Sequence, residues 1–305
     1  MVMKRILFFL SALCWTMAVN AQGMDSLQAI RDVRQLQSGT LASRAAGSRG
    51  SREAQYYLMN RFRAIGVLPL SGTYEQPFFF QYGARRIMGT NLMGYIKGTT
   101  QDWIVVGAHY DHPVASAEAA VQDSLHPRVG DNASGIAVLL ALASWLKTHP
   151  PVHNILLVAF DATEEGMQGA ASFQQHSDIW EKIRVFVNLD RVGLGPEVMV
   201  CGTERFPALK PSIAEADSGS VLRILYAGDS GKDAWIMRAD QQPFVKAGIP
   251  SLYLTSSRQP EEGNQPDLKW LWAAVRFTGQ VVQHLDGYSG VRLPPKNKWI
   301  MKQSR

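Results

Sequence analysis

The sequence feature that most limits the fold of this chain is a series of short apolar runs separated by helix-like segments. The clearest runs are Trp103 to Ala108, Ile155 to Phe160 and Val185 to Leu189. Short apolar runs of this kind are typical of strands buried on both faces, and strands that alternate with helices favour a parallel sheet. We therefore predict an α/β fold, a three-layer α/β/α sandwich with a mostly parallel central sheet.

Other segments continue this alternation of strands and helices. Apolar spacing predicts helices over Asp25 to Gln37, Ser51 to Ile65 and Asp267 to Leu285. Strands are predicted over Tyr74 to Tyr82 and Asn91 to Ile96 and near Val198, Leu222 and Ser251, and further helices over Asn132 to Lys147, Gly169 to His176 and Lys210 to Ala216. No repeat, low-complexity linker or composition shift marks a second domain, so residues 22–305 are expected to form one domain.

Residues 1–21 have the composition of a cleaved signal peptide. Lys4 and Arg5 precede an apolar core, and the small residues ending at Ala21 suit cleavage. The core is shorter than the roughly 20 residues that cross a bilayer, and no later run is long and uncharged enough to do so. We expect an exported protein, periplasmic or extracellular, with no stable membrane insertion.

Cysteine content and net charge narrow the possible partners. Loss of the signal peptide removes Cys14, so the expected mature chain has Cys201 alone and no intramolecular disulfide. Cys201 is expected to be a buried apolar residue rather than a nucleophile. Loss of Lys4 and Arg5 lowers the formal charge from +5 to +3, which gives no support to a nucleic-acid partner.

Residue types that bind zinc or move protons lie where predicted strands end or a helix begins. They are His109, Asp131, Glu164, Glu165 and Asp190. Ligands of open α/β sheets bind beyond the carboxyl ends of the strands, so these side chains are expected to share one rim. Taken singly, Asp131 is also a plausible helix N-cap and the two glutamates a solvated turn. As a set, they predict a metal site.

The local spacing suggests roles within that site. Asp111 follows His109 by two residues and suits a carboxylate that orients a metal-binding imidazole. The adjacent Glu164 and Glu165 repel each other unless a cation or a proton offsets their charge. If one of them binds metal, the other is placed to take a proton from a metal-activated water.

The motifs GAHYDH, GDNASG, TEEG and NLDRVG, in this order, make the chain resemble the secreted co-catalytic zinc aminopeptidases of the bacterial leucyl aminopeptidase type, which are related to the glutaminyl cyclases. The resemblance covers nearly the whole of residues 22–305. It implies a zinc exopeptidase-like catalytic domain, peptide substrates and one or two Zn²⁺ per chain. It also implies that His109 and Asp190 hold one zinc, that Asp131 bridges, and that Glu165 holds the other with a late histidine. Glu164 would be the general base.

Two positions depart from that family pattern. Arg258 stands where the late histidine is expected, and Gln241 replaces an earlier one. Arginine stays protonated and cannot bind zinc. His112 or His126 would have to substitute, or a single zinc would be held by His109, Asp131 and Asp190. Arg258 would instead pair with Glu165 or contact substrate.

Three functions therefore stay open on the sequence alone. The leading one is an exported zinc-dependent aminopeptidase, a hydrolase of N-terminal residues with Glu164 as base. The second is a glutaminyl cyclase-like acyltransferase, which depends more heavily on the late histidine. The third is a non-catalytic relative that binds peptides, for which Arg258 is the main support. The substrate preference and the oligomeric state are not predicted.

Overall fold

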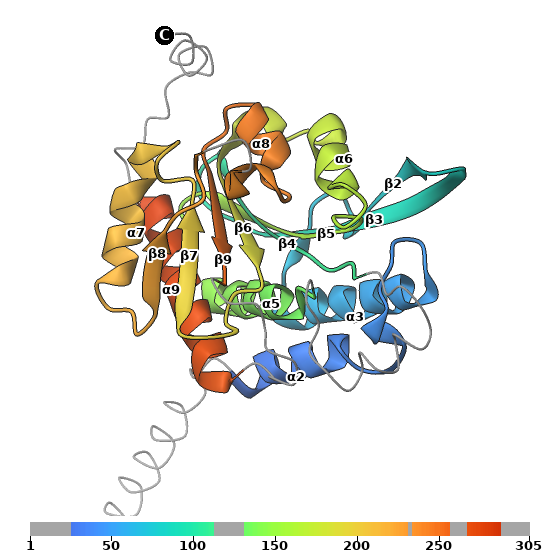
Figure 1. Cartoon of the computed structure of the whole chain (residues 1–305), viewed down its shortest axis with the longest axis horizontal. Coiled ribbons are helices and arrows are strands. Elements are labelled where there is room, and N and C mark those ends of the chain that lie inside the picture. The colour runs from blue at the N-terminus through green and yellow to red at the C-terminus, as the bar shows by residue number, and fades with distance from the viewer. Residues whose placement is uncertain (1–25, 113–130, 231–233, 257–266, 288–305) are drawn as a thin grey trace, which may run out of the picture.

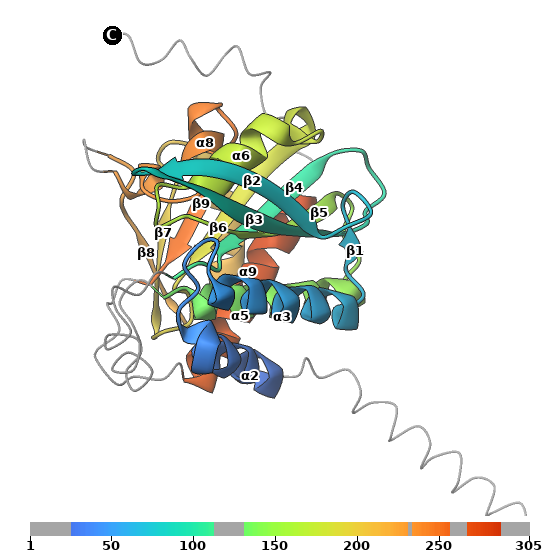
Figure 2. The same cartoon turned by 90° about the vertical axis from the view of Figure 1, so that its right-hand side faces the viewer.

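The computed structural model describes residues 26–112, 131–230, 234–256 and 267–287 of the chain (Figure 1). These residues form three layers, with helices on both faces of one central sheet (Figures 1 and 2). The predicted three-layer α/β/α fold is confirmed. The predicted signal peptide at residues 1–21 lies outside the described residues.

Within the described residues, the sheet has nine strands, of which eight lie in the order β1-β3-β5-β4-β6-β9-β7-β8 while β2 pairs with β3. The strands are β1 (Leu68–Pro69), β2 (Glu75–Tyr82), β3 (Arg85–Ile96), β4 (Trp103–His109), β5 (Asn154–Phe160), β6 (Ile183–Asp190), β7 (Glu197–Cys201), β8 (Arg223–Tyr226) and β9 (Ser251–Thr255). The central strands β5, β4, β6 and β9 are mutually parallel. The flanking pairs β3 with β5 and β7 with β9 are antiparallel. The predicted parallel sheet thus forms the centre, and its carboxyl ends all point to the same rim.

Helices cover the two faces of this sheet unequally (Figure 1). One face carries α2 (Ser26–Leu36), α3 (Arg49–Ile65), α5 (Ala133–Thr148), α7 (Lys210–Asp217) and α9 (Leu268–Gly287). The other face carries α6 (Gln168–His176) and α8 (Gln242–Lys246). Short 3-10 turns η2 (Gly39–Ala42), η3 (Trp180–Lys182), η4 (Pro207–Leu209) and η5 (Trp235–Met237) join them. Across the described helices, none combines the length and the apolar character that a membrane crossing requires.

In the described residues, the alternation of side chains along the central strands gives an apolar core on each face of the sheet. In β4, Ile104 and Val106 point into the core beneath α5 and α9, whereas Val105 points into the core beneath α6 and α8. The smaller core is aromatic, and Phe186 of β6 stacks on Phe244 of α8 with ring centroids 3.9 Å apart. Burial on both faces explains why the central strands appear in the sequence as continuous apolar runs.

The β2–β3 hairpin is longer than predicted, because β3 begins at Arg85 rather than near Asn91. Charged and small residues in this part of β3 break the apolar pattern from which strands are predicted. Gly89 lies opposite Phe78, and a side chain at Gly89 would meet the Phe78 ring at 2.4 Å. The first half of β3 therefore extends beyond the main sheet and pairs there with β2 (Figure 1).

Candidate metal and active site

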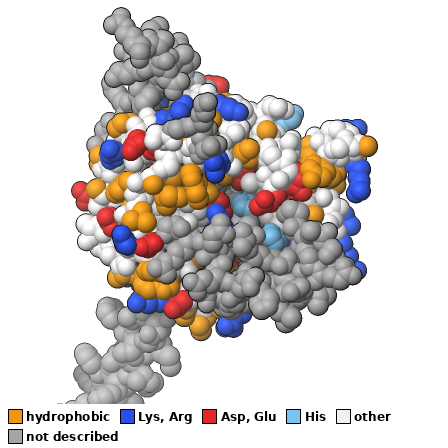
Figure 3. Space-filling model, in the orientation of Figure 1, with side chains coloured by type: hydrophobic (Ala, Val, Ile, Leu, Met, Phe, Trp, Pro, Cys, Tyr) orange, Lys and Arg blue, Asp and Glu red, His pale blue; other side chains and the backbone are white. Residues whose placement is uncertain are grey.

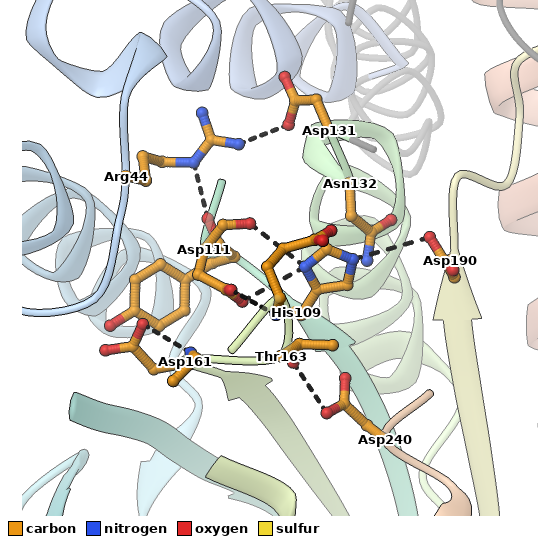
Figure 4. Close-up of polar contacts among 12 residues, drawn as sticks. Arg44, His109, Asp111, Asp131, Asn132, Asp161, Thr163, Asp190 and Asp240 are labelled. Carbon is orange, nitrogen blue, oxygen red and sulfur yellow. Dashed lines mark hydrogen bonds and ion pairs between the residues drawn. The ribbon is translucent and has the colours of Figure 1, made fainter. Parts of the chain in front are cut away.

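Four of the predicted site residues lie at or just beyond the carboxyl ends of three neighbouring strands. His109 is the last residue of β4, Asp190 is the last residue of β6, and Glu164 and Glu165 follow the end of β5. Because β5, β4 and β6 are parallel neighbours, these ends share one rim, as predicted. Figure 4 shows His109 between Asp111 and Asp190.

His109 is buried and lies between two carboxylates. Its Nδ1 is 3.3 Å from Asp111 Oδ1, and its Nε2 is 3.7 Å from Asp190 Oδ1. Burial lowers the pKa of His109, but the hydrogen bonds and charges of Asp111 and Asp190 outweigh burial and raise it well above its ordinary value. The imidazole therefore has one partner for each ring nitrogen, which fixes the plane of the ring.

Asp111 connects His109 to the turn that carries the two glutamates. Asp111 is fully buried, and its Oδ2 accepts a hydrogen bond of 3.0 Å from the backbone N–H of Glu164. Burial raises its pKa, but His109 and the N–H groups of Thr163 and Glu164 lower it overall. Asp111 therefore contacts both the His109 ring and the backbone of Glu164.

The backbone is strained on both sides of the acidic residues. Among the described residues, the non-glycine residues with positive φ are Ala162 (55°), Met167 (61°) and Arg191 (55°). Ala162 and Met167 bracket the two glutamates, and Arg191 directly follows Asp190. Left-handed backbone costs about 1–2 kcal/mol at such residues and persists where the surrounding structure imposes it, which is common at functional sites.

Asp190 has two partners that sequence reasoning missed. Tyr253 of β9 donates its hydroxyl to Asp190 Oδ2 at 2.5 Å, and Arg191 Nε lies 3.4 Å from Oδ1. Burial raises the pKa of Asp190, but His109, Arg191 and Tyr253 outweigh it and lower the pKa to about 2. Tyr253 lies in a predicted strand, but its sequence position gives no sign that its hydroxyl reaches the rim.

Asp131 is buried at the start of α5, where its Oδ1 accepts from the N–H of Ala133 at 2.9 Å. That carboxylate also forms an ion pair with Arg44 and accepts from Gln37 Nε2 at 3.2 Å. Figure 4 shows Asp131 directed toward Arg44. Neither Arg44 nor Gln37 was predicted at the site.

Arg44 is fully buried and uses its remaining N–H groups on backbone carbonyls. Its Nε donates to Tyr110 at 2.7 Å, and its Nη1 donates to Leu36 and Leu41 at 2.6 and 2.7 Å. These bonds tie α2, η2 and the segment after β4 to the start of α5. In the described part of the chain, no three or more His, Cys, Asp or Glu side chains are arranged to hold a metal ion.

Negative charge is concentrated around this rim. Burial and neighbouring carboxylates raise the pKa of Glu165 and of Asp240 to about 7, despite the 2.8 Å hydrogen bond from Thr163 Oγ1 to Asp240. Glu165 Oε2 and Asp240 Oδ2 are buried and have no hydrogen-bond partner among the described residues. Buried anionic oxygens without partners require a proton or a cation.

The positions that depart from the family pattern have different outcomes. Gln241 is buried, accepts from Asn188 at 2.8 Å and donates to the Trp235 carbonyl at 3.1 Å, so it joins β6 to η5. His112 is buried, and its backbone pairs with that of Arg44. Its charge helps to lower the pKa of Asp131. His126 and Arg258 lie outside the described residues.

The family profile of Peptidase family M28 matches residues 91–272, which include every predicted metal ligand. The chain belongs to Peptidase family M28. This is the family to which the sequence motifs pointed. The matched residues run from β3 to the start of α9. They therefore include His109 and all the central strands of the sheet.

Individual relatives agree with this family. Aminopeptidase YwaD of Bacillus subtilis is 36% identical over 94 residues, covering 30% of this chain and 18% of the relative. The chain spans less than half the length of the curated relatives it matches.

Two solved structures share the fold. A zinc aminopeptidase from Bacillus subtilis superposes with a TM-score of 0.65 at 16% identity, covering 86% of this chain and 96% of the other. The Porphyromonas gingivalis glutaminyl cyclase superposes with a TM-score of 0.67 at 20% identity, covering 86% of this chain and 98% of the other.

Proposed function

We propose that this chain is an exported zinc-dependent aminopeptidase that removes N-terminal residues from peptides. The observation that carries the proposal is the buried arrangement of Asp190, His109, Asp111 and the Glu164 backbone at one rim of the sheet. Membership in the M28 family and the names of the relatives support the reaction class. Residues 22–305 would be the single catalytic domain, and the composition of residues 1–21 supports export.

The chemistry of the rim fits a divalent cation. Asp240 and Glu165 each bury a carboxylate oxygen without a partner among the described residues, and a nearby cation would satisfy such oxygens. Imidazole and carboxylate groups are common zinc ligands. His109 and Asp190 would hold one ion and Glu165 would contribute to another.

Asp131 would join His109 and Asp190 in binding one ion and would bridge to a second. In this structure its carboxylate is held by Arg44 and Gln37. Binding a cation would therefore require Asp131 to exchange at least one of these contacts. This competition would weaken cation binding through Asp131.

Glu164 is the proposed general base. Its side chain is exposed at the rim while its backbone is held by Asp111. Partial desolvation of its carboxyl, together with the charges of Asp111 and Asp190, raises the pKa of Glu164 against the opposing charges of His109 and Arg191. A carboxylate with a raised pKa is a stronger base, which suits removal of a proton from water and its delivery to the leaving amine. Bound zinc would polarise the scissile carbonyl and acidify water.

Turnover of a panel of amino-acid anilides by zinc-loaded protein tests this function. The wild type is expected to release the aniline, and Glu164→Gln is expected to lose at least about 100-fold in kcat while still binding zinc. Peptides with N-terminal glutamine should be followed in parallel for loss of ammonia. Ammonia release without anilide hydrolysis would favour the cyclase, and no turnover of either substrate at full zinc occupancy would overturn an enzymatic role.

A further inference from the structure

A large groove opens beside Glu164 and Glu165. The rest of its lining has no role in the proposed reaction. Its volume is about 1010 Å³. It lies between residues 45–48, which precede α3, and the β2–β3 hairpin. Glu164 and Glu165 line it together with Thr90 of β3. Pockets that enclose drug-sized ligands have volumes of about 300–1,000 Å³, so this groove is large for a single amino-acid side chain.

Apart from Glu75 of β2, the charged residues on the groove walls away from Glu164 and Glu165 are basic. Arg85 and Arg86 of β3 and Arg52 of α3 are exposed and line it. Figure 3 shows basic side chains along the side of the molecule where the β2–β3 hairpin lies in Figure 1. Arg52 donates to the Gly47 carbonyl at 3.2 Å, and Arg86 lies 4.3 Å from the centre of the Phe79 ring. Within the described residues, none of the three forms an ion pair with a carboxylate.

The distance along the groove from the glutamates to the arginines can be estimated from β3. Thr90 is anchored there, because its N–H donates to Asp161 at 2.9 Å and its carbonyl accepts from Tyr110 at 2.9 Å. Arg86 and Arg85 precede Thr90 by four and five residues in the same strand. At about 3.4 Å per residue, the two arginines lie roughly 14–17 Å along the strand from Thr90.

This proposal rests on the aminopeptidase function and names its substrate class. An aminopeptidase binds one residue on the amino side of the cleaved bond, so the rest of a peptide must leave the rim on the carboxyl side. We propose that this remainder lies in the groove and that Arg52, Arg85 and Arg86 bind a carboxylate on it. An extended peptide also advances about 3.3 Å per residue, so the carboxylate would be about four or five residues from the N-terminus.

The carboxylate has two possible sources, an acidic side chain or the C-terminus of a short peptide. Peptides with aspartate or asparagine as the fifth residue, both amidated at the C-terminus, isolate the side chain. Five-residue peptides with a free or an amidated C-terminus isolate the terminal carboxylate. Each peptide begins with the residue that gives the fastest anilide turnover, and that anilide serves as the substrate that does not reach the arginines.

The experiment compares kcat/KM for these substrates in wild type, in R85Q/R86Q and in R276Q. The Arg276 control is exposed on α9, away from the hairpin. Exposed ion pairs change an equilibrium by factors of about 1.5 to 5 each. Wild type and R276Q are therefore expected to prefer the carboxylate peptides about three- to tenfold over their amide partners. In R85Q/R86Q this preference should fall to less than about twofold, when kcat/KM of each peptide is divided by that of the anilide. Adding salt should weaken the preference in the wild type.

The proposal would be overturned if the wild type had equal kcat/KM for the carboxylate peptides and their amide partners, or if the preference survived in R85Q/R86Q. Either result would leave the aminopeptidase function intact. If no anilide is turned over, peptide binding to zinc-loaded Glu164→Gln, measured by calorimetry, still tests the groove. Tighter binding of the aspartate peptide that R85Q/R86Q abolishes would support the groove. Equal binding of the two peptides would reject it.

Discussion

Arg44 and Asp131 form an ion pair in which only 1% and 3% of the two side chains are exposed. The pair joins the segment between η2 and α3 to the start of α5, where a metal-bridging carboxylate is expected. Burial alone raises the pKa of Asp131, but the charges of Arg44 and His112 and two hydrogen bonds outweigh it and keep the pKa below its ordinary value. A residue proposed to bind metal therefore also has a structural partner within the protein.

Replacing Arg44 with methionine should strongly destabilise the metal-free protein. Loss of one partner leaves the other charge buried, which costs about 3–5 kcal/mol, and the carbonyls of Tyr110, Leu36 and Leu41 also lose their donor. Urea unfolding of metal-free protein measures the change. The matched control is Arg49→Met, because Arg49 is 79% exposed and pairs with Glu53, so its loss should cost less than about 0.5 kcal/mol. Equal losses in the two variants would contradict this account.

Asp111→Asn should weaken zinc binding without unfolding the protein. The asparagine side chain would keep an oxygen for the Glu164 N–H but would lose the negative charge beside His109. Residues that orient metal ligands typically change metal affinity 10- to 100-fold, and we expect a weakening in this range together with lower kcat. Competition with a chromophoric chelator gives the affinity. Asp178→Asn, an exposed substitution outside the rim, is the control and should leave affinity within about twofold.

Asp161 should make the metal-free protein less stable as pH rises from about 4 to about 7. Burial and the charge of Asp111 raise its pKa from 3.8 to about 7, against hydrogen bonds from the backbone N–H groups of Thr90 and Ala162. Below pH 4 the Asp161 carboxyl is protonated in both the folded and the unfolded protein. Between the two values the unfolded chain loses its proton first, so stability falls with rising pH and levels off above about 7.

The full effect of Asp161 corresponds to at most about 4 kcal/mol. Urea unfolding from pH 4 to 7.5, for wild type and Asp161→Asn, measures it. The asparagine variant should lack this part of the pH dependence, whatever its stability at a single pH. Parallel curves for the two proteins would show that Asp161 titrates normally.

Cys201 should resist alkylation in the native protein. It is buried, and burial together with the charge of Asp229 raises the pKa of its thiol to about 12. Because the thiolate is the reactive form, iodoacetamide at pH 8 should label Cys201 only after unfolding in urea. Peptide mapping by mass spectrometry locates the label. Rapid labelling of Cys201 in the native state would show that β7 opens easily.

Most helices and strands could be predicted from local sequence, because their signals are local. Continuous apolar runs mark β4, β5 and β6, and apolar spacing marks α3 and α9. The early start of β3 was missed, since Arg85 and Arg86 carry no local sign of strand structure and are held by pairing with β2. The buried position of Cys201 was predicted correctly and is confirmed.

The candidate site was only partly predictable. His109, Asp190 and Glu164 were expected at one rim because each lies at or just beyond a strand end, and the parallel sheet brings these ends together. The partners of these residues come from distant segments: Tyr253 lies 63 residues from Asp190, and Arg44 lies 87 residues from Asp131. No local pattern encodes such contacts, because they arise only when helices and strands pack.

The sequence by itself determined the α/β alternation, the set of acids with His109, and membership in a zinc peptidase family, since each depends on residue type and order along the chain. The tertiary structure alone decided that Arg44 and Gln37 hold the Asp131 carboxylate, and that three arginines line a groove beside Glu164. The physical reason is that side-chain pairing and cavity shape depend on distances between segments far apart in sequence, which only packing of the whole fold sets.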